Sequence, residues 1–360
     1  MRFAWALAVA ELDGYKPDMR RPMRLGLAIL AALLVIAGAY SAYWFIVAGR
    51  IKEGVAAWAQ SARAEKIDVS WRQIRVKGYP ADLRVELEAA ALRDDGLIPA
   101  PELRAPFLAG TARPWDLADW QLTAPEGFSG ELVGLSGHKP LEMSADNADG
   151  VVAIEPDGGW KLWLRSQNAK IQAGEGAQIG SADTWVIVPQ KPSSGPTEPP
   201  MALAVNAHQV RLSTRIEPLG DTIDDLDFGF TVNGVIPRGK LAQAMAAWRD
   251  AGGMIELDNL HLRWGGLGAT ATGTIALDQK LQPIGGFSGA IQGYDQILTA
   301  LVQSGRLRAT DAGLARIALT MLAKAGPDGR PEIRTAFTIQ NGEMFLGPAK
   351  LGKTPHINWD

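Results

Sequence analysis

The sequence contains no cysteine and only four histidines in 360 residues. Without thiols the chain can form neither a disulfide framework nor a zinc-thiolate or iron–sulfur centre, and it has no cysteine nucleophile. The histidines are scattered and offer little for imidazole chemistry: His138, His208, His261 and His356. We therefore expect no cofactor and no metal site. The length is sufficient for one large or two ordinary domains with a real core.

An excess of charge of one sign is also missing, since 36 basic residues stand against 39 acidic ones. A protein that binds nucleic acid needs a basic patch to contact the phosphates. We identify no such patch in the sequence, so nucleic acid is not an expected partner.

The most prominent feature that is present is an apolar run from Met23 to Ala48, in which Arg24 is the only charged residue. About 20 apolar residues suffice for a helix to cross a bilayer core of roughly 30 Å. Aromatic residues, which favour the headgroup region, gather at the end of the run: Tyr40, Tyr43, Trp44 and Phe45. Basic residues, which favour the cytoplasmic side, gather at its start: Arg20, Arg21 and Arg24.

We predict a transmembrane anchor over residues 23–48, a cytoplasmic N-terminus over residues 1–22, and a body outside the cytoplasm from residue 49. A cleaved signal peptide is the alternative, because Ala37-Gly38-Ala39 offers a small-x-small site. The apolar run continues for nine residues beyond that site, as a retained anchor would. Met19 begins a stretch typical of a native start, so residues 1–18 are interpreted as a start-site extension.

The part outside the cytoplasm is acidic, because residues 49–360 contain 31 basic and 36 acidic residues. Bulk charge should keep such a body soluble and should not hold it on anionic lipid headgroups. Its first segment, Arg50 to Lys66, has the spacing of an amphipathic helix that lies on the membrane surface or packs on the following domain, and the mixture of acidic and basic residues on its polar face favours the domain. The apolar stripe of that helix is Ile51, Val55, Trp58, Ala59 and Ala62.

Beyond this helix the pattern is that of β-strands. Residues 71–88 are predicted to form a hairpin around Gly78-Tyr79-Pro80, because apolar and charged residues alternate on both sides of that turn. Further strands are predicted at Val151–Ile154, Trp160–Leu164, Thr184–Val188 and Leu203–Leu212. The Pro-rich stretch 191–200 is a surface loop or a boundary between two β-rich sections, residues 49–190 and 201–360.

The second section adds short helices to the strands. Helical spacing occurs over residues 240–250, 297–302 and 314–322, and Thr310 or Asp311 could cap the last of these helices. Strands 255–264 and 268–278 pair with a bulge near Asp258-Asn259, and a final hairpin turns at Asn341-Gly342. The predicted fold class is an N-terminal transmembrane helix followed by a mainly antiparallel β (α+β) body with a few short helices.

No stretch specifies a catalytic site. Gly174 to Gly180 misses the dinucleotide-binding spacing, and Ser136-Gly137-His138 lacks a nucleophile-elbow pattern. Four acidic residues stand close together but without the spacing of an EF-hand: Asp221, Asp224, Asp225 and Asp227. We interpret them as a solvated loop before a strand over residues 228–232. The chain is not expected to be an enzyme.

The twelve tryptophans allow two interpretations. They can fill the core of a β-sandwich, or they can line a curved sheet whose concave face holds an acyl chain. Strict alternation places Trp163 on the opposite face from Trp160. The candidate ligand groove consists of Trp160, Trp163, Trp185 and Trp264.

Four stretches of the chain resemble the domain of unknown function 2125 family of mainly alphaproteobacterial proteins. They are YSAYWFIVAGRIKEGVAAWA from Tyr40, WRQIRVKGYPADLRVEL from Trp71, LHLRWGGLGATATGTIALD from Leu260 and TIQNGEMFLGPAKLGKTPHI from Thr338. The resemblance implies a single-pass inner-membrane protein with its N-terminus in the cytoplasm and a β-rich body in the periplasm. It supplies no activity and no catalytic residues. A looser similarity to AsmA-type envelope proteins rests on fold-level analogy.

Three functional hypotheses follow. The leading one is a non-enzymatic, membrane-anchored periplasmic protein whose β-sheet binds a hydrophobic ligand such as a lipid, or an envelope protein partner. The second is a structural or scaffolding protein with a filled core and no ligand. The third is an envelope hydrolase that uses Asp or Glu, which requires two carboxylates facing each other in a cleft.

Overall fold

A computed structural model describes residues 20–98, 100–132, 140–173, 175–190, 201–305, 307–326, 329–347 and 349–359. The chain divides into two compact units, residues 1–51 and residues 52–360. The first unit contains most of a long helix, and the second contains all the strands. The Ser136-Gly137-His138 stretch and the Pro-rich stretch 191–200 lie outside the described residues.

Helix α1 extends over Arg20–Ala64 without interruption. The predicted anchor and the predicted amphipathic helix are therefore one helix rather than two. Residues 49–64 contain good helix formers and no proline, so nothing stops the helix where the apolar run ends. From Gly26 onward α1 is long and apolar enough to cross a membrane.

The last turns of α1 belong to the second unit and pack there beside β1. Ala59 and Ala62 form a buried cluster with Val69, and Ile67 and Trp71 pack against it. Packing on the following domain is thus confirmed for the two alanines. Trp58, which belongs to the predicted stripe, is 53% exposed and takes no part in this cluster.

The described strands form one 19-stranded sheet and one two-stranded sheet. In the first half of the large sheet they are β1 Ile67–Ser70, β2 Gln73–Lys77, β3 Leu83–Asp94, β5 Glu102–Arg113, β6 Asp116–Ala124, β7 Phe128–Leu132, β8 Leu141–Ala145, β9 Asn147–Ile154, β10 Trp160–Ala173 and β11 Glu175–Val188. In the second half they are β12 Met201–Ile216, β13 Gly220–Asn233, β15 Met254–Trp264, β16 Leu267–Leu277, β17 Pro283–Gln292, β18 Lys324–Ala325, β19 Pro331–Gln340, β20 Glu343–Leu346 and β21 Ala349–Lys353. The small sheet pairs β4 Leu97–Ile98 with β14 Gly239–Lys240 in parallel.

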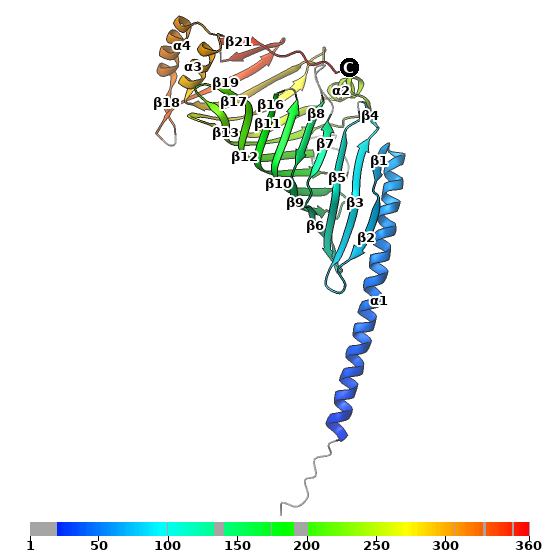
Figure 1. Ribbon diagram of the computed structural model, residues 1–360. Coiled ribbons are helices and arrows are strands. Elements are labelled where there is room, and N and C mark those ends of the chain that lie inside the picture. Colours follow the sequence, from blue (N-terminus) through cyan, green and yellow to red (C-terminus); the bar gives the residue numbers. More distant parts are fainter. Residues whose placement is uncertain are drawn as a thin grey trace, which may run out of the picture. The chain divides into compact units, whose positions relative to one another are not determined.

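The large sheet is an antiparallel meander in which neighbours in the chain are mostly neighbours in space (Figure 1). Strands β1 and β2 share one edge of β3, and the ladder then continues through β5, β10, β11, β12, β13, β15, β16, β17 and β19 to β20 and β21. Between β5 and β10 the pairs β6–β9 and β7–β8 each fill half of the strand length. Because β11 pairs with β12, the β-rich sections on either side of residues 191–200 are parts of one sheet.

The predicted mainly antiparallel β body is confirmed, and so are the two hairpins that were assigned from sequence. Strands β2 and β3 pair around the turn before Leu83, and β19 and β20 pair around Asn341-Gly342. The predicted bulge near Asp258-Asn259 is present as a register shift between Leu257 and Leu260. Most observed strands are longer than the predicted ones.

Three short helices accompany the sheet: α2 Leu241–Asp250, α3 Tyr294–Gln303 and α4 Ala309–Leu322. Their existence confirms the helical spacing in the second section. The predicted cap of the last helix is wrong, because α4 begins after Arg308 and no side chain caps it. Thr310 and Asp311 instead lie inside its first turn.

A crease crosses the large sheet from β1 and β2 to β12. Ala89, Asn168 and Gln209, in β3, β10 and β12, all have positive φ near 50°, a backbone conformation that is rare outside glycine. Asn168 lies opposite Gly180 of β11, and Gly180 lies opposite Gln209, so the unusual residues form one row. The breaks between β1 and β2, between β6 and β7, and between β8 and β9 continue this row.

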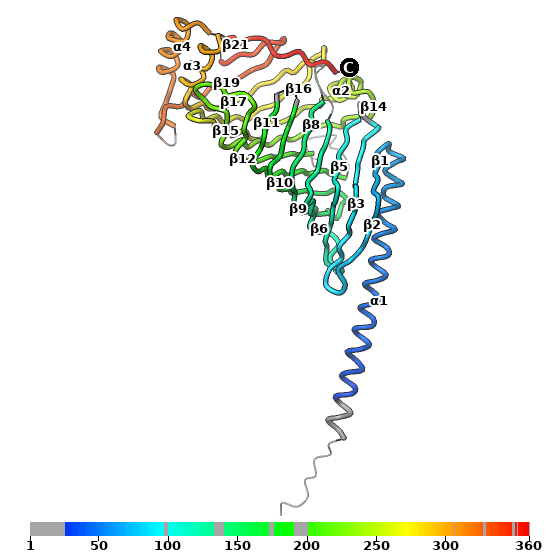
Figure 2. The backbone as a smooth tube through the Cα atoms, viewed as in Figure 1, coloured from blue at the N-terminus to red at the C-terminus, as the bar shows by residue number. Residues whose placement is uncertain are grey.

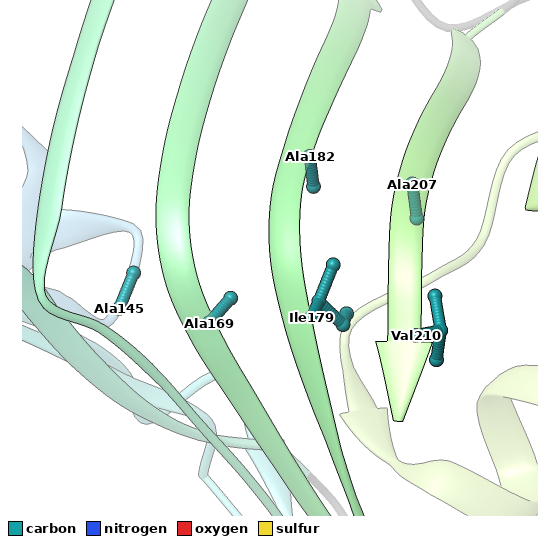
Figure 3. Close-up of a cluster of buried hydrophobic side chains, with 6 residues drawn as sticks. All are labelled: Ala145, Ala169, Ile179, Ala182, Ala207 and Val210. Atoms are coloured by element: carbon teal, nitrogen blue, oxygen red, sulfur yellow. The ribbon is translucent and has the colours of Figure 1, made fainter. Parts of the chain in front are cut away.

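Small apolar side chains fill the inside of the crease. The buried cluster comprises Ala145, Ala169, Ile179, Ala182, Ala207 and Val210. Figure 3 shows these side chains on adjacent strands where the strands bend, and the bend is also visible in the backbone trace of Figure 2. Four of the six are alanines, because a concave bend brings neighbouring strands too close for larger residues.

Candidate functional site

The register of the strands assigns side chains to two faces, since directly opposite residues in an antiparallel ladder share a face. One unbroken row of such residues crosses eleven strands from β6 to β20, and it contains no charged residue. The row is Trp120, Val152, Leu162, Val186, Leu203, Phe230, Leu257, Gly273, Phe287, Phe337 and Leu346. We call the side of the sheet that carries this row the apolar face.

The neighbouring rows on the same side are also apolar. The next row, which lies two residues away from the first on most strands, consists of Leu122, Gly150, Leu164, Thr184, Val205, Phe228, Leu260, Ala271, Gly289 and Thr335. The bulge in β15 keeps Leu257 and Leu260 on one side although they are three residues apart. The crease has the same effect in β12, where Ala207 and Val210 are three residues apart and still belong to one buried cluster on one side of the sheet.

Aromatic rings and partial exposure characterise the apolar face. The rings of Phe228 and Phe230 stack at 6.3 Å between centroids, and those of Phe287 and Phe337 lie 5.9 Å apart. Most side chains of the two rows are half-buried, and Ile154, on the same side of β9, is 48% exposed. Water therefore reaches this face over much of its length.

The opposite side of the sheet, which we call the polar face, carries charged and hydrogen-bonding residues. One of its rows is Thr123, Asp149, Arg165, Asp183, Asn206, Asp227, His261, Thr270, Ala290 and Arg334. Arg165 pairs with Asp183 through two hydrogen bonds of 2.9 and 3.0 Å. The sheet is thus amphipathic across its width.

Asp225 and Asp227 of the acidic cluster belong to this polar face, and the interpretation of the cluster as a loop is wrong. Residues Gly220–Asn233 form β13, and the carboxylates of Asp225 and Asp227 lie beside basic residues of the adjacent strands. Asp225 accepts a 2.7 Å hydrogen bond from Nδ1 of His208 and forms an ion pair with Arg263. Asp227 lies 3.4 Å from Nδ1 of His261. Among the described residues no group of three or more His, Asp and Glu side chains could hold a metal ion.

The hydrogen bond from His208 is the main cause that lowers the pKa of Asp225, and Arg263 adds to it while partial burial opposes both. A carboxyl whose pKa is lowered by folding stabilises the folded state above its unfolded pKa, and this contribution is lost as the pH falls through the folded pKa. Asp225→Asn should therefore cost about 1 kcal/mol at neutral pH, and this difference from wild type should shrink as the pH falls below the unfolded pKa of about 3.9 and through the lowered pKa of the folded state.

Urea unfolding of both proteins at neutral and at acidic pH would measure this difference. Asp119→Asn, at an exposed carboxylate of β6, is the matched control and should change stability by less than about 0.5 kcal/mol. A cost for Asp225→Asn that stays the same at low pH would contradict the assigned ion pairing.

The four candidate groove tryptophans divide between the two faces. Trp163 and Trp185 lie directly opposite each other on the polar face, and the guanidinium of Arg165 lies 5.3 Å from the centroid of the Trp163 ring. Trp160 and Trp264 lie on the apolar face, on strands β10 and β15. The four side chains therefore do not line one surface together.

Sequence reasoning overlooked the aliphatic rows that make up most of the apolar face. Their signal is present in the sequence as alternation within each strand, for example in residues 184–188 and 203–205. The alternation shows which residues of one strand share a side. It cannot show that these sides coincide across eleven strands, because that depends on the register.

The polar face also contains shallow hollows. The largest described one has a volume of about 830 Å³ and lies over β15, β16, β17 and β19. Its lining includes His261, Thr270, Ser288, Glu332 and Arg334. Such a lining suits water or a polar partner rather than a hydrocarbon chain.

Comparison with known proteins gives one match. The family model described as "Uncharacterized protein conserved in bacteria (DUF2125)" matches residues 44–355, which cover the end of the apolar run and almost the entire body. No curated protein and no solved structure matches the chain.

Proposed function

Because the chain belongs to the uncharacterised bacterial DUF2125 family, whose description assigns no activity, its function has to be inferred from its surfaces, and we propose that the apolar face binds the acyl chains of a lipid. In this proposal α1 anchors the protein in the inner membrane, with the N-terminus in the cytoplasm and the β-rich body in the periplasm. The protein acts without catalysis.

The observation that carries the proposal is the uncharged row from Trp120 to Leu346. Eleven strands at about 4.8 Å spacing give the row a length of roughly 50 Å. The acyl chains of one leaflet extend over only about 15 Å, half of a bilayer core. The face therefore has room for several lipids in succession, and each buried methylene contributes about 0.8 kcal/mol.

The partial exposure of the apolar face supports a ligand more than a filled core. A soluble body that leaves a contiguous apolar surface half-exposed over many strands normally uses it for binding. A scaffold without ligand would instead gain stability by closing this surface.

The carboxyl groups with displaced pKa values favour a non-enzymatic role. A hydrogen bond from Lys77 is the main cause that lowers the pKa of Glu86, and Asp225 is likewise lowered. General acid catalysis requires a carboxyl whose pKa is raised toward neutrality. Both groups instead serve as ionised partners of basic side chains.

Photo-crosslinking in living cells would test lipid binding. The amino acid p-benzoylphenylalanine is placed at Val186 on the apolar face or at Ile187 on the polar face, in the full chain expressed in a Gram-negative host with radiolabelled phosphate. The proposal expects labelled phospholipid to be attached at position 186 and little or none at position 187. Equal labelling at both positions would refute it, and a crosslink to a protein at position 186 would favour the scaffold.

A further inference from the structure

Helix α4 exposes an apolar stripe that the rest of the described body leaves uncovered. Its residues follow the 3.6-residue period of one helix face, and their exposed fractions lie between 58% and 81%: Leu314, Ile317, Met321 and Leu322. Such exposure is much greater than that of the half-buried residues on the apolar face of the sheet. The stripe therefore belongs to neither the core nor the proposed acyl-binding surface.

The other side of α4 is held firmly. Ala312 is buried, the hydroxyl groups of Tyr294 and Thr320 lie 3.3 Å apart, and Arg316 forms a 2.8 Å ion pair with Asp295. Tyr294 and Asp295 belong to α3, so the two helices form a hairpin. The stripe on α4 faces away from this hairpin because the opposite side of the helix is already occupied.

The charge around the stripe differs from that of the body. Residues 306–330 contain five basic and two acidic residues, whereas the rest of residues 49–360 contains 26 basic and 34 acidic residues. This local excess of basic residues is hidden in the near-neutral total charge of the chain. Basic residues that flank an exposed apolar helix face favour a surface that is both apolar and anionic.

We propose that α4 docks on the surface of a bilayer containing anionic lipids. Leu314, Ile317 and Met321 enter the boundary between headgroups and acyl chains, and Arg308 and Lys324, which are exposed at the two ends of α4, contact the phosphates. Charge complementarity distinguishes this occupant from an apolar protein groove, which would gain nothing from the basic flanks. The proposal is independent of lipid binding by the sheet, because it involves different residues.

The location of α4 gives the docking a consequence for the whole body. Helix α4 packs beside β19, near the end of the sheet that finishes with β21, whereas α1 packs beside β1 at the other end (Figure 1). Docking through α4 would therefore hold the body at the end of the sheet opposite to the last turns of α1.

The absence of cysteine makes a site-specific test direct. Met321→Cys is labelled with an environment-sensitive nitrobenzoxadiazole probe, and the full chain is placed in phosphatidylcholine nanodiscs. Vesicles of phosphatidylcholine with about one third phosphatidylglycerol are then added. We expect a blue shift and at least about a twofold rise in fluorescence. Ile236→Cys, an exposed position in the loop before β14, is the matched control and should not change.

The double variant L314D/I317D should weaken vesicle binding at least about tenfold, because it removes two inserting side chains. V235D/I236D adds the same charges elsewhere and should not weaken vesicle binding.

The outcomes of the fluorescence experiment are distinct. A blue shift that occurs without added vesicles, once the nanodisc itself contains phosphatidylglycerol, also supports docking. The proposal is overturned if there is no blue shift with phosphatidylglycerol in the vesicles or in the nanodisc. It is also overturned if the shift depends on protein concentration alone, because α4 would then be covered by a second copy of this chain. The crosslink at position 186 should be unchanged by L314D/I317D, so failure of one proposal is distinguishable from failure of the other.

Discussion

Replacing Val186 by Glu is expected to reduce lipid labelling by a photo-crosslinker at Leu203 at least about tenfold. Val186 lies between Leu162 and Leu203 in the central row of the apolar face. An acyl chain that covers a carboxylate must remove its water, at a cost of several kcal/mol, and about 1.4 kcal/mol already corresponds to tenfold. The measurement is the amount of labelled phospholipid per protein in cells that express the full chain.

Ile187→Glu provides a closely matched control, because it adds the same charge to the next residue of the same strand. Ile187 is 39% exposed and lies opposite Lys161 on the polar face, where a carboxylate is tolerated. Labelling at Leu203 should therefore stay near the wild-type level. Equal losses for the two variants would mean that charge anywhere on the sheet disturbs the protein, and the assignment of the ligand to one face would have to be abandoned.

The second large effect is expected at Gly127, in the crease between β6 and β7. Gly127 has a φ of +71°, and a Cβ atom added there would lie 1.8 Å from the carbonyl oxygen of Ala145. An L-residue in this conformation costs about 1–2 kcal/mol, and moving the backbone to relieve the contact costs about as much again. Gly127→Ala should therefore lower the free energy of unfolding by about 3 kcal/mol or more.

Denaturant unfolding followed by tryptophan fluorescence would measure this loss. Gly286→Ala is the control, because a Cβ atom there meets nothing within 4 Å and its φ is not positive. Its effect should be within about 1 kcal/mol of zero. If both variants were equally stable, the crease would be able to relax without cost and could not be a fixed bend of the sheet.

Local patterns determined much of what could be predicted from sequence. The apolar run identifies α1, because no other local pattern accommodates 26 residues with one charge. Alternation identifies the hairpins, and the slip between Leu257 and Leu260 identifies the bulge in β15. Each of these features depends on residues close together in the chain, so the sequence displays it directly.

The crease and the apolar face depend on how separate strands line up with one another, which a single segment of sequence does not show. Residues Ala169 and Val210 belong to one cluster because β10, β11 and β12 bend in the same row, and no single strand shows that its bend is shared. The acidic residues of β13 resemble a loop in the sequence because the partners of Asp225, His208 and Arg263, come from other strands. The carboxylates of Asp225 and Asp227 look solvated when β13 is considered alone, but in the sheet they lie beside basic residues of neighbouring strands.

The sequence by itself thus determined the long apolar helix, the strand-forming segments and the absence of thiol chemistry, because these follow from composition and from periods of two or 3.6 residues. Only the tertiary structure decided which tryptophans share a face, that Trp163 and Trp185 lie on the polar one, and that the stripe of α4 is left exposed. The physical reason is that a period assigns residues to sides of one element, whereas strand register and helix packing decide what each side meets.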